Sequence, residues 1–243
     1  MRYMIKFSYD GTLFYGYQKQ PGLRTIEECL EKALYDINNH KYTKIVASGR
    51  TDKGVHALEQ VAAFDLDIDI TLPKLKMAMN SLLPGDIHVI STETVDKDFH
   101  PRYMAKEKTY MYIINTGEYN PMNRNYRYEL NKKLNIDNMK KAIKSFIGEH
   151  DFYSFVSNEC IKDSYVRIIK DVSIIEEDSK IIITFTGNGF MKYQVRNMVG
   201  TLIKVGLGKL DTNIIDKIFE DKSCEKYVFT APSSGLYLKN VKY

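Results

Sequence analysis

The sequence contains few cysteines, and their spacing fits neither a disulfide framework nor a structural zinc site. Three occur among 243 residues, at Cys29, Cys160 and Cys224, and there is no Cys-x-x-Cys pair. An odd number of well-separated cysteines is typical of proteins in the reducing cytosol. The five histidines show neither the helical spacing nor the cysteine partners of a metal site, so we predict no bound metal.

Long apolar runs are also missing. No segment approaches the roughly 20 apolar residues that a membrane-spanning helix needs. The first ten residues, Met1 to Asp10, lack the apolar core of a secretory signal peptide. We therefore expect a cytoplasmic protein without a membrane partner.

Three common nucleotide-binding and catalytic motifs are absent. Gly11 and Gly16 have the spacing of a P-loop, but Tyr17 and Gln18 replace the Lys-Ser/Thr pair of that motif. The run Gly187-Asn188-Gly189 is not followed by the third glycine of a dinucleotide-binding fingerprint, and no Gly-x-Ser-x-Gly elbow occurs. A hydrolase that uses two carboxylates is harder to exclude, because the chain contains 31 acidic residues.

The net charge of +4 is small, but the basic residues are concentrated in two segments. Residues 100–133 contain seven Lys/Arg and three acidic residues, and residues 189–209 contain four Lys/Arg and no acidic residue. Basic groups neutralise phosphates and aromatic rings stack on bases, so this pattern favours a nucleic-acid surface. A solvated basic face with core tyrosines explains the composition equally well. The first segment also contains six tyrosines: Tyr103, Tyr110, Tyr112, Tyr119, Tyr126 and Tyr128.

The order of expected elements predicts an α+β fold. Residues 2–9 alternate between apolar and polar side chains, as in a half-buried strand. Thr25 and Glu28 have the spacing of a capping box at the start of an amphipathic helix. No linker-like segment separates the two parts of the chain, which favours two halves that share one sheet. The further strands are expected at 44–48, 58–66, 86–95, 106–116, 166–176 and 180–187, and the further helices at 73–83, 137–148 and 190–205.

The most informative segment is Gly49-Arg50-Thr51-Asp52-Lys53-Gly54-Val55-His56-Ala57, which follows one of the short expected strands. Its two glycines permit a sharp turn and a close approach to a ligand. Arg50 and Lys53 place positive charge beside Asp52, which keeps the carboxylate ionised and attracts an anionic substrate. For an isolated Asp-x-Gly, the simpler explanation is a turn in which Asp52 bonds only its own backbone.

The Asp52 segment resembles the active-site loop of the TruA family of tRNA pseudouridine synthases. Two departures concern packing and RNA contact rather than chemistry: Tyr17 stands where that family usually has Trp, and Lys108 where Arg is commoner. Five further segments resemble motifs of the same family in the family's order: 9–20, 99–112, 148–155, 187–200 and 231–238.

The resemblance implies that the protein is an isomerase that converts uridine to pseudouridine in tRNA, at positions 38, 39 and 40 of the anticodon arm. No cofactor is required. Family members are homodimers in which one tRNA reaches across both subunits, so we expect tRNA and a second copy as partners, and no DNA. We predict two RRM-like (ferredoxin-like) halves, 1–104 and 105–243, that share a mostly antiparallel sheet, with Asp52 in a cleft between them.

The matched motifs also imply a role for each of four residues. Asp52 is the essential carboxylate, which either attacks C1′ or removes a proton from the sugar. Arg196 pairs with Asp52 and keeps it ionised. Tyr110 stacks on the target uracil, and removal of the C5 proton is a second role open to it. Arg50 fills the space vacated by the flipped nucleotide. Without the resemblance, Arg196 would be a surface charge and Tyr110 a core tyrosine of a strand.

Two other functions remain compatible with parts of the pattern. A non-catalytic RNA-binding or RNA-folding protein on the same scaffold would have lost Asp52, Tyr110 or Arg196, and all three are present. A related enzyme that acts on another tRNA position or on ribosomal RNA would show the same motifs. His56 and His100 lie near the suspected site in the sequence, but each is more simply explained as structural.

Overall fold

The computed structural model describes residues 1–157, 161 and 163–243, and it divides into two compact units. The first unit comprises Met1–Lys106 and Leu238–Tyr243, and the second comprises Glu107–Tyr237. The change of unit after Lys106 lies two residues from the predicted boundary at 104, whereas residues 238–243 join the first unit. The predicted halves, 1–104 and 105–243, stay a prediction.

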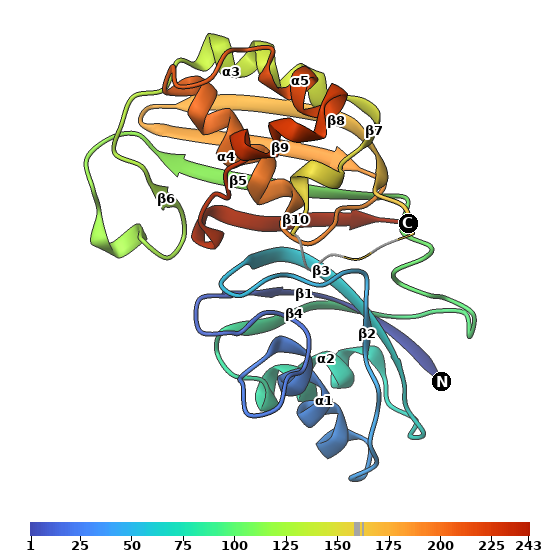
Figure 1. Ribbon diagram of the computed structural model, residues 1–243. Coiled ribbons are helices and arrows are strands. Elements are labelled where there is room, and N and C mark those ends of the chain that lie inside the picture. The colour runs from blue at the N-terminus through green and yellow to red at the C-terminus, as the bar shows by residue number, and fades with distance from the viewer. Residues whose placement is uncertain (158–160, 162) are drawn as a thin grey trace. The chain divides into compact units, whose positions relative to one another are not determined.

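The first unit contains a sheet with helices α1 and α2 on one face (Figure 1). Strand β1 is antiparallel to both of its neighbours, β3 and β4, and the short strand β2 is also antiparallel to β3. The strand order is β4 (Ile87–Thr94), β1 (Arg2–Tyr9), β3 (His56–Asp65) and β10 (Leu236–Lys242), with β2 (Val46–Ala47) beside β3. The two helices are α1 (Ile26–Ile37) and α2 (Leu72–Leu82).

The sequence pattern of β1 and α1 is confirmed by their burial. Tyr3, Ile5 and Phe7 alternate along β1 and are completely buried, and the apolar face of α1 is buried as predicted. The capping-box prediction is wrong. Thr25 is the N-cap residue of α1, but it is itself completely buried and its side chain makes no capping hydrogen bond. The local spacing therefore predicted the start of the helix correctly, but not the capping hydrogen bond.

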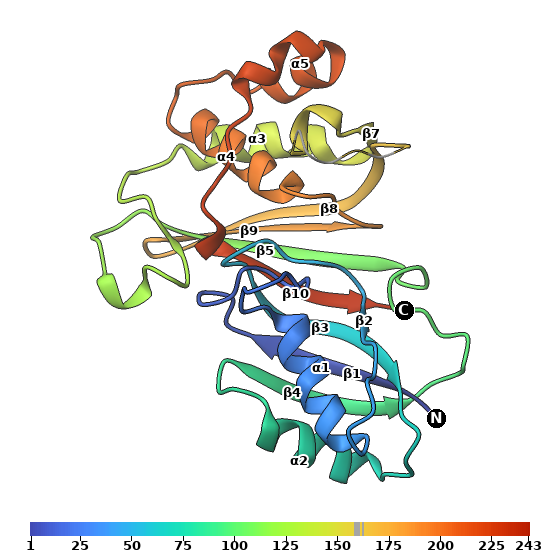
Figure 2. The same cartoon turned by 60° about the horizontal axis from the view of Figure 1, so that its bottom comes forward.

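The second unit also has its helices α3, α4 and α5 on one side of its strands (Figure 2). Strand β9 is antiparallel to both β5 and β8, whereas β6 is parallel to β5. The strand order is β5 (Glu107–Asn115), β9 (Lys180–Gly187), β8 (Val166–Glu177) and β7 (Gly148–Asp151), with β6 (Tyr128–Glu129) beside β5. The helices are α3 (Ile136–Ala142), α4 (Gln194–Gly206) and α5 (Ile214–Glu220). The 3₁₀ turns of this unit are η1 (Pro121–Asn123), η2 (Ile143–Phe146), η3 (Tyr153–Phe155), η4 (Lys222–Tyr227) and η5 (Ser233–Gly235).

Both units combine helices with mostly antiparallel strands, so the α+β prediction is confirmed. Two helix boundaries in the second unit are wrong. Helix α4 begins at Gln194 rather than near 190, because Tyr193 at its N-cap adopts a left-handed conformation with φ of 65°. Helix α3 ends at Ala142, and the chain continues as the 3₁₀ turn η2 before Gly148 starts a strand.

Two sequence-based expectations concern the location of the protein and its cysteines. No helix among the described residues is long and apolar enough to span a membrane. Cys29 and Cys224 are free thiols, and Cys160 lies outside the described residues.

Candidate active site

Asp52 lies in the loop that connects β2 to β3 in the first unit. The two strands pair Val46 with Ala63 and Ala47 with Ala62, and the amide of Ser48 continues the ladder to Val61 at 2.8 Å. The amide of Val55 donates to the backbone carbonyl of Asp52 at 3.1 Å, which closes a turn. Asp52 itself is half-buried, so its position is accessible to a ligand.

The opening motif, residues 9–20, packs directly on the Asp52 loop through main-chain contacts. The amide of Tyr17 donates to the carbonyl of Thr51 at 3.0 Å, and the amide of Gly54 donates to that of Phe14 at 3.3 Å. A Cβ at Gly11 would lie 2.0 Å from the carbonyl oxygen of Val55, so only glycine fits there. The two motifs are therefore one structural element, although 40 residues separate Gly11 from Thr51 along the chain.

A buried hydroxyl pair fixes Thr51, the residue before Asp52. The hydroxyl of Tyr9 and the Oγ1 of Thr51 lie 2.8 Å apart, and burial raises the pKa of Tyr9 to about 12. This pKa keeps the phenol protonated at neutral pH, so it can hydrogen-bond to Thr51 without adding a negative charge beside Asp52.

Two basic residues flank Asp52 on the outside of the loop, as the sequence indicated. The ammonium of Lys53 lies 4.0 Å from the centroid of the Tyr15 ring, a cation–π distance. Arg50 is exposed at the start of the loop. Both charges are therefore placed where an anionic substrate can reach them.

Arg196 lies on the first turn of α4 in the second unit and is half-buried. Its Nε donates to the carbonyl of Ala231 at 2.8 Å, and the Ala231 amide donates back to the Arg196 carbonyl at 3.0 Å. Its guanidinium carbon also lies 4.6 Å from the centroid of the Tyr193 ring. The side chain is therefore oriented by the closing motif, 231–238, and by the N-cap residue of its own helix.

Tyr110 occupies a buried position of β5, opposite Phe185 of β9. Its side chain is 8% exposed, and its ring makes an edge-to-face contact with that of Phe190 at 5.2 Å between centroids. Asp52 and Arg50 thus belong to the first unit, and Tyr110 and Arg196 to the second. The predicted pairing of Arg196 with Asp52 stays a prediction.

The two histidines near the suspected site have structural contacts. Nδ1 of His56 accepts the amide of Gly11 at 3.1 Å, and this imidazole is 2% exposed. Nδ1 of His100 accepts the amides of Arg102 and Tyr103 at 3.2 and 3.3 Å. Within the described part of the chain, no group of three or more His, Cys, Asp or Glu side chains is arranged to hold a metal ion.

Comparison with known proteins identifies the family. The family model described as tRNA pseudouridine synthase matches residues 5–104 and 142–243. A tRNA pseudouridine synthase A of Limosilactobacillus reuteri is 42% identical over 247 residues, which cover 100% of this chain and 96% of that protein. The enzyme of the same name from Streptococcus uberis is 44% identical over 245 residues, 100% of this chain and 98% of its own. The chain belongs to the tRNA pseudouridine synthase family.

A solved structure shows only a distant likeness. A chain in the crystal structure of a Cbf5-Nop10-Gar1 complex aligns with 95% of this chain and 70% of its own, at 12% identity and a TM-score of 0.35. That score is too low to inform the fold. The resemblance to the tRNA pseudouridine synthases that the sequence motifs indicated is confirmed by the curated relatives, and these enzymes are isomerases.

The segments that the tRNA pseudouridine synthase model matches contain three of the four predicted site residues. Arg50 and Asp52 lie in the first matched segment and Arg196 in the second. Tyr110 lies between the two segments, although the relatives align with the chain from end to end. The neighbours of Asp52 contact the opening motif, and Arg196 contacts the closing motif.

The sequence patterns did not indicate Gln60, whose side chain forms hydrogen bonds with the start of the Asp52 loop. Its Oε1 accepts the Ser48 hydroxyl at 2.6 Å and its Nε2 donates to the carbonyl of Gly49 at 3.1 Å. Gln60 and Ser48 are both completely buried. The available signal was an amide side chain within the apolar strand β3, since such a group needs internal partners.

Tyr17, one of the two departures from the TruA pattern noted in the sequence, supplies a test of packing. Its side chain is 2% exposed, and its hydroxyl has no hydrogen-bond partner among the described residues. Replacing Tyr17 with Phe should therefore leave stability unchanged or raise it by up to about 1 kcal/mol, because an unsatisfied buried hydroxyl is removed. Urea unfolding of the purified protein measures this difference.

The matched control is Tyr9→Phe, which removes a buried hydroxyl that does have a partner. Loss of the Tyr9–Thr51 bond leaves the Thr51 hydroxyl without its partner, so stability should fall by roughly 1 kcal/mol. Equal destabilisation by both substitutions would contradict the assignment of Tyr17 as the unsatisfied group.

Proposed function

We propose that this protein isomerises uridine to pseudouridine at positions 38, 39 and 40 of the tRNA anticodon arm, in the cytoplasm and without a cofactor. The observation that carries the proposal is the half-buried Asp52 at a turn that the opening motif holds through main-chain bonds. The family match and the tRNA pseudouridine synthase A relatives support the reaction class. The choice of positions follows from the TruA resemblance.

The reaction needs no external reagent, because product and substrate are isomers. The N1–C1′ bond breaks, the detached uracil turns, C5 bonds to C1′, and the proton on C5 leaves while N1 gains one. Asp52 supplies the ionised oxygen, which either attacks C1′ or removes a sugar proton. Both routes need a deprotonated carboxylate at neutral pH.

Arg196 and Arg50 have supporting roles in this proposal. Arg196 keeps Asp52 ionised through its positive charge. Its fixed orientation, set by Ala231 and Tyr193, supports that role, because an immobilised guanidinium loses little entropy on pairing. The exposed Arg50 occupies the space left when the target nucleotide flips out of its stack, a step that costs a few kcal/mol.

The remaining organisation is proposed on the family resemblance alone. Two RRM-like halves, 1–104 and 105–243, share a sheet and form the cleft in which Asp52 acts. The enzyme is a homodimer that binds tRNA across both subunits and does not act on DNA. A sedimentation mass of about twice 28.2 kDa would support the dimer, and an active monomer would contradict it.

The direct test is to incubate the purified protein with an unmodified tRNA transcript and to map pseudouridine by position. Modification at 38, 39 or 40 is expected. Tight tRNA binding without any pseudouridine would instead favour an RNA-folding protein on the same scaffold. Modification at another tRNA position would favour a related enzyme with a shifted target. Loss of a pseudouridine from ribosomal RNA in a strain lacking the gene would favour the same alternative.

Tyr110 has two proposed roles that substitution can separate. Its ring stacks on uracil with or without the hydroxyl, and such stacking is worth roughly 1–3 kcal/mol. The hydroxyl is needed only if it accepts the C5 proton after the new bond has formed. Tyr110→Phe should then bind tRNA with unchanged affinity but fail to release tritium from C5-labelled uridine. Tyr110→Ala should weaken binding and turnover together.

Comparing tRNA affinity and tritium release between Tyr110→Phe and Tyr110→Ala distinguishes the two roles. Turnover of Tyr110→Phe at the wild-type rate would remove the proton-transfer role and leave Tyr110 as a stacking platform. The buried position of Tyr110 requires a stability check, since Ala leaves a cavity beside Phe190 whereas Phe keeps the ring volume.

A further inference from the structure

The loop between β5 and β6 presents large side chains to solvent. Tyr119 is 54% exposed, Met122 79% and Tyr126 44%, and Arg124 between them is exposed as well. The loop lies between the two segments that the family model matches. Apolar and aromatic side chains concentrated on one short exposed loop usually mark a contact surface.

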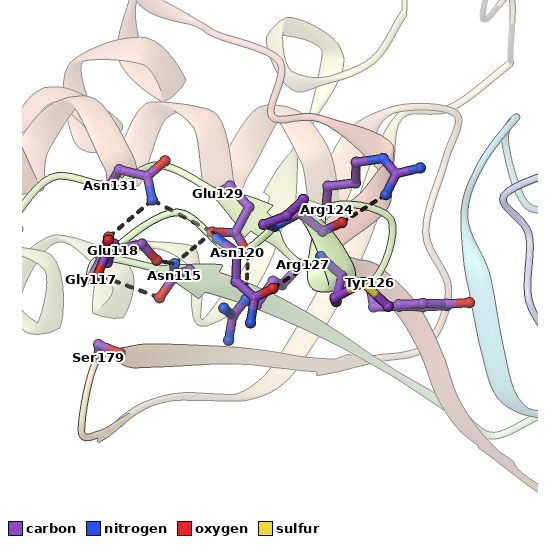
Figure 3. A network of polar contacts seen from close by, with 12 residues as sticks. Asn115, Gly117, Glu118, Asn120, Arg124, Tyr126, Arg127, Glu129, Asn131 and Ser179 are labelled. Carbon is purple, nitrogen blue, oxygen red and sulfur yellow. Dashed lines mark hydrogen bonds and ion pairs between the residues drawn. The ribbon is translucent and has the colours of Figure 1, made fainter.

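A carboxylate at the base of the loop holds it in place. Glu129 accepts hydrogen bonds from Nε of Arg127 at 2.5 Å, Nδ2 of Asn115 at 2.6 Å and the amide of Asn120 at 3.3 Å (Figure 3). Burial raises the pKa of the Glu129 carboxyl, but the bonds from Arg127, Asn115 and Asn120 outweigh burial and leave this pKa below its usual value. The ionised carboxylate therefore connects the loop to the end of β5.

The other end of the loop is bonded to the segment that orients Arg196. The hydroxyl of Tyr237 donates to the carbonyl of Tyr126 at 2.6 Å, and the Ser234 hydroxyl lies 3.5 Å from the carbonyl of Arg127. Both donors belong to the closing motif, 231–238, whose Ala231 bonds Arg196. In Figure 3 the ring of Tyr126 extends away from the Glu129 network. The Tyr126 carbonyl is therefore fixed by Tyr237, while its ring is exposed to solvent.

We propose that residues 116–127 form a preformed binding surface for tRNA, on which Arg124 contacts phosphate and Tyr119 and Tyr126 stack on nucleotides. Glu129 is its positioning residue. The nature of the RNA rests on the function proposed above. An ordered surface loses little conformational entropy on binding, which gives the Glu129 network its functional value.

Charge favours RNA over a protein as the occupant. Arg127 is already paired with Glu129, so within residues 116–133 the exposed charged side chains are Arg124, Lys132 and Lys133 against Glu118. Lys132 and Lys133 follow the proposed surface in the chain, just after β6. Excess positive charge with interleaved aromatic rings fits phosphates and bases. An apolar protein surface would gain nothing from these charges.

Glu118 and Glu129 provide a test in which the direction of the change in tRNA affinity is decisive. Glu129→Gln and Glu118→Gln each remove one negative charge, and simple electrostatics predicts tighter tRNA binding for both. If Glu129 positions the loop, Glu129→Gln should instead weaken tRNA binding several-fold and raise KM, with the single-turnover rate at saturating tRNA unchanged. Glu118→Gln, whose side chain is exposed, should bind as tightly as wild type or more tightly.

The surface itself is tested with Arg124→Ala and Tyr119→Ala, two exposed residues whose replacement leaves the core intact. Arg124→Ala should lower the slope of log Kd against log salt by about one, as expected for one lost phosphate contact. Tyr119→Ala should weaken binding by roughly fivefold or more through lost stacking.

Because tRNA affinity and pseudouridine formation are measured independently, the proposed binding surface and the proposed function can each be refuted without the other. If wild type forms no pseudouridine but Glu129→Gln, Arg124→Ala and Tyr119→Ala still lose tRNA affinity, the surface stands and the function falls. If wild type is active and Glu129→Gln, Arg124→Ala and Tyr119→Ala all bind tRNA like wild type, the surface is refuted. A changed sedimentation mass in Arg124→Ala or Tyr119→Ala with unchanged tRNA affinity would show a subunit contact instead and would also refute it.

Discussion

Asp52→Asn should abolish pseudouridine formation while tRNA binding survives. Asn has nearly the same shape as Asp, so the turn closed by the Val55 amide and the Asp52 carbonyl is kept. The ionised oxygen is lost, and loss of an essential catalytic group typically lowers turnover by at least roughly 10⁴-fold. Removing a negative charge also reduces electrostatic repulsion of the RNA phosphates, so tRNA affinity should stay equal or rise.

Two further variants test whether the loss of turnover is specific to the position of the Asp52 carboxylate. Asp52→Glu keeps the charge but moves the carboxylate by about one bond length, and a large part of the rate should be lost because catalysis depends on geometry. Asp67→Asn removes a carboxylate from an exposed ion pair with Lys41 in the same unit and should leave turnover unchanged. Measurable turnover by Asp52→Asn at a tenth of the wild-type rate would show that another group does the chemistry.

Gly200→Ala should destabilise the protein strongly, although alanine is the better helix former. Gly200 lies within α4, and a Cβ there would be 1.9 Å from the carbonyl oxygen of Phe229 and 2.6 Å from its carbon. Both are backbone atoms, so the segment that reaches Ala231 must move. We expect a loss of about 3 kcal/mol or more from overpacking, against a propensity gain of about 1 kcal/mol.

Thermal unfolding measures this effect, and Gly85→Ala is its matched control. A Cβ at Gly85 meets nothing within 4 Å, so that variant should unfold at nearly the wild-type temperature. Gly200→Ala should also reduce turnover beyond its stability loss, because the displaced Ala231 carbonyl orients Arg196. An unchanged melting temperature for Gly200→Ala would mean that α4 does not pack this closely on residues 229–231.

The elements that sequence predicted well are those in which local pattern and tertiary burial agree. Strand β1 alternates and buries its apolar face, and α1 buries the stripe that its spacing indicates. Boundaries failed where a single residue overrides the pattern. Tyr193 adopts φ of 65° without being glycine, which no propensity rule predicts, and it delays the start of α4.

The contacts around the candidate site were predictable only in part, for a physical reason. Asp52 and its basic neighbours are contiguous in sequence, so their local chemistry could be recognised directly. The contacts of Gly11 with Val55 and of Arg196 with Ala231 join residues 44 and 35 positions apart, and single-sequence patterns carry no information on such pairs. Glu129 was missed for the same reason, since its partners include Asn115.

The first unit is completed by residues that are synthesised only after the second unit. Strand β10 follows β3 in the strand order, and residues 238–243 belong to the unit that begins at Met1. The Lys242 carbonyl accepts the Lys106 amide at 2.8 Å, and the Tyr243 hydroxyl donates to the carbonyl of Pro101 at 2.7 Å. During synthesis the β3 edge therefore stays without this partner until the second unit has emerged. A nascent chain stalled before residue 238 would expose that edge to other chains, which makes late translational arrest a cause of aggregation.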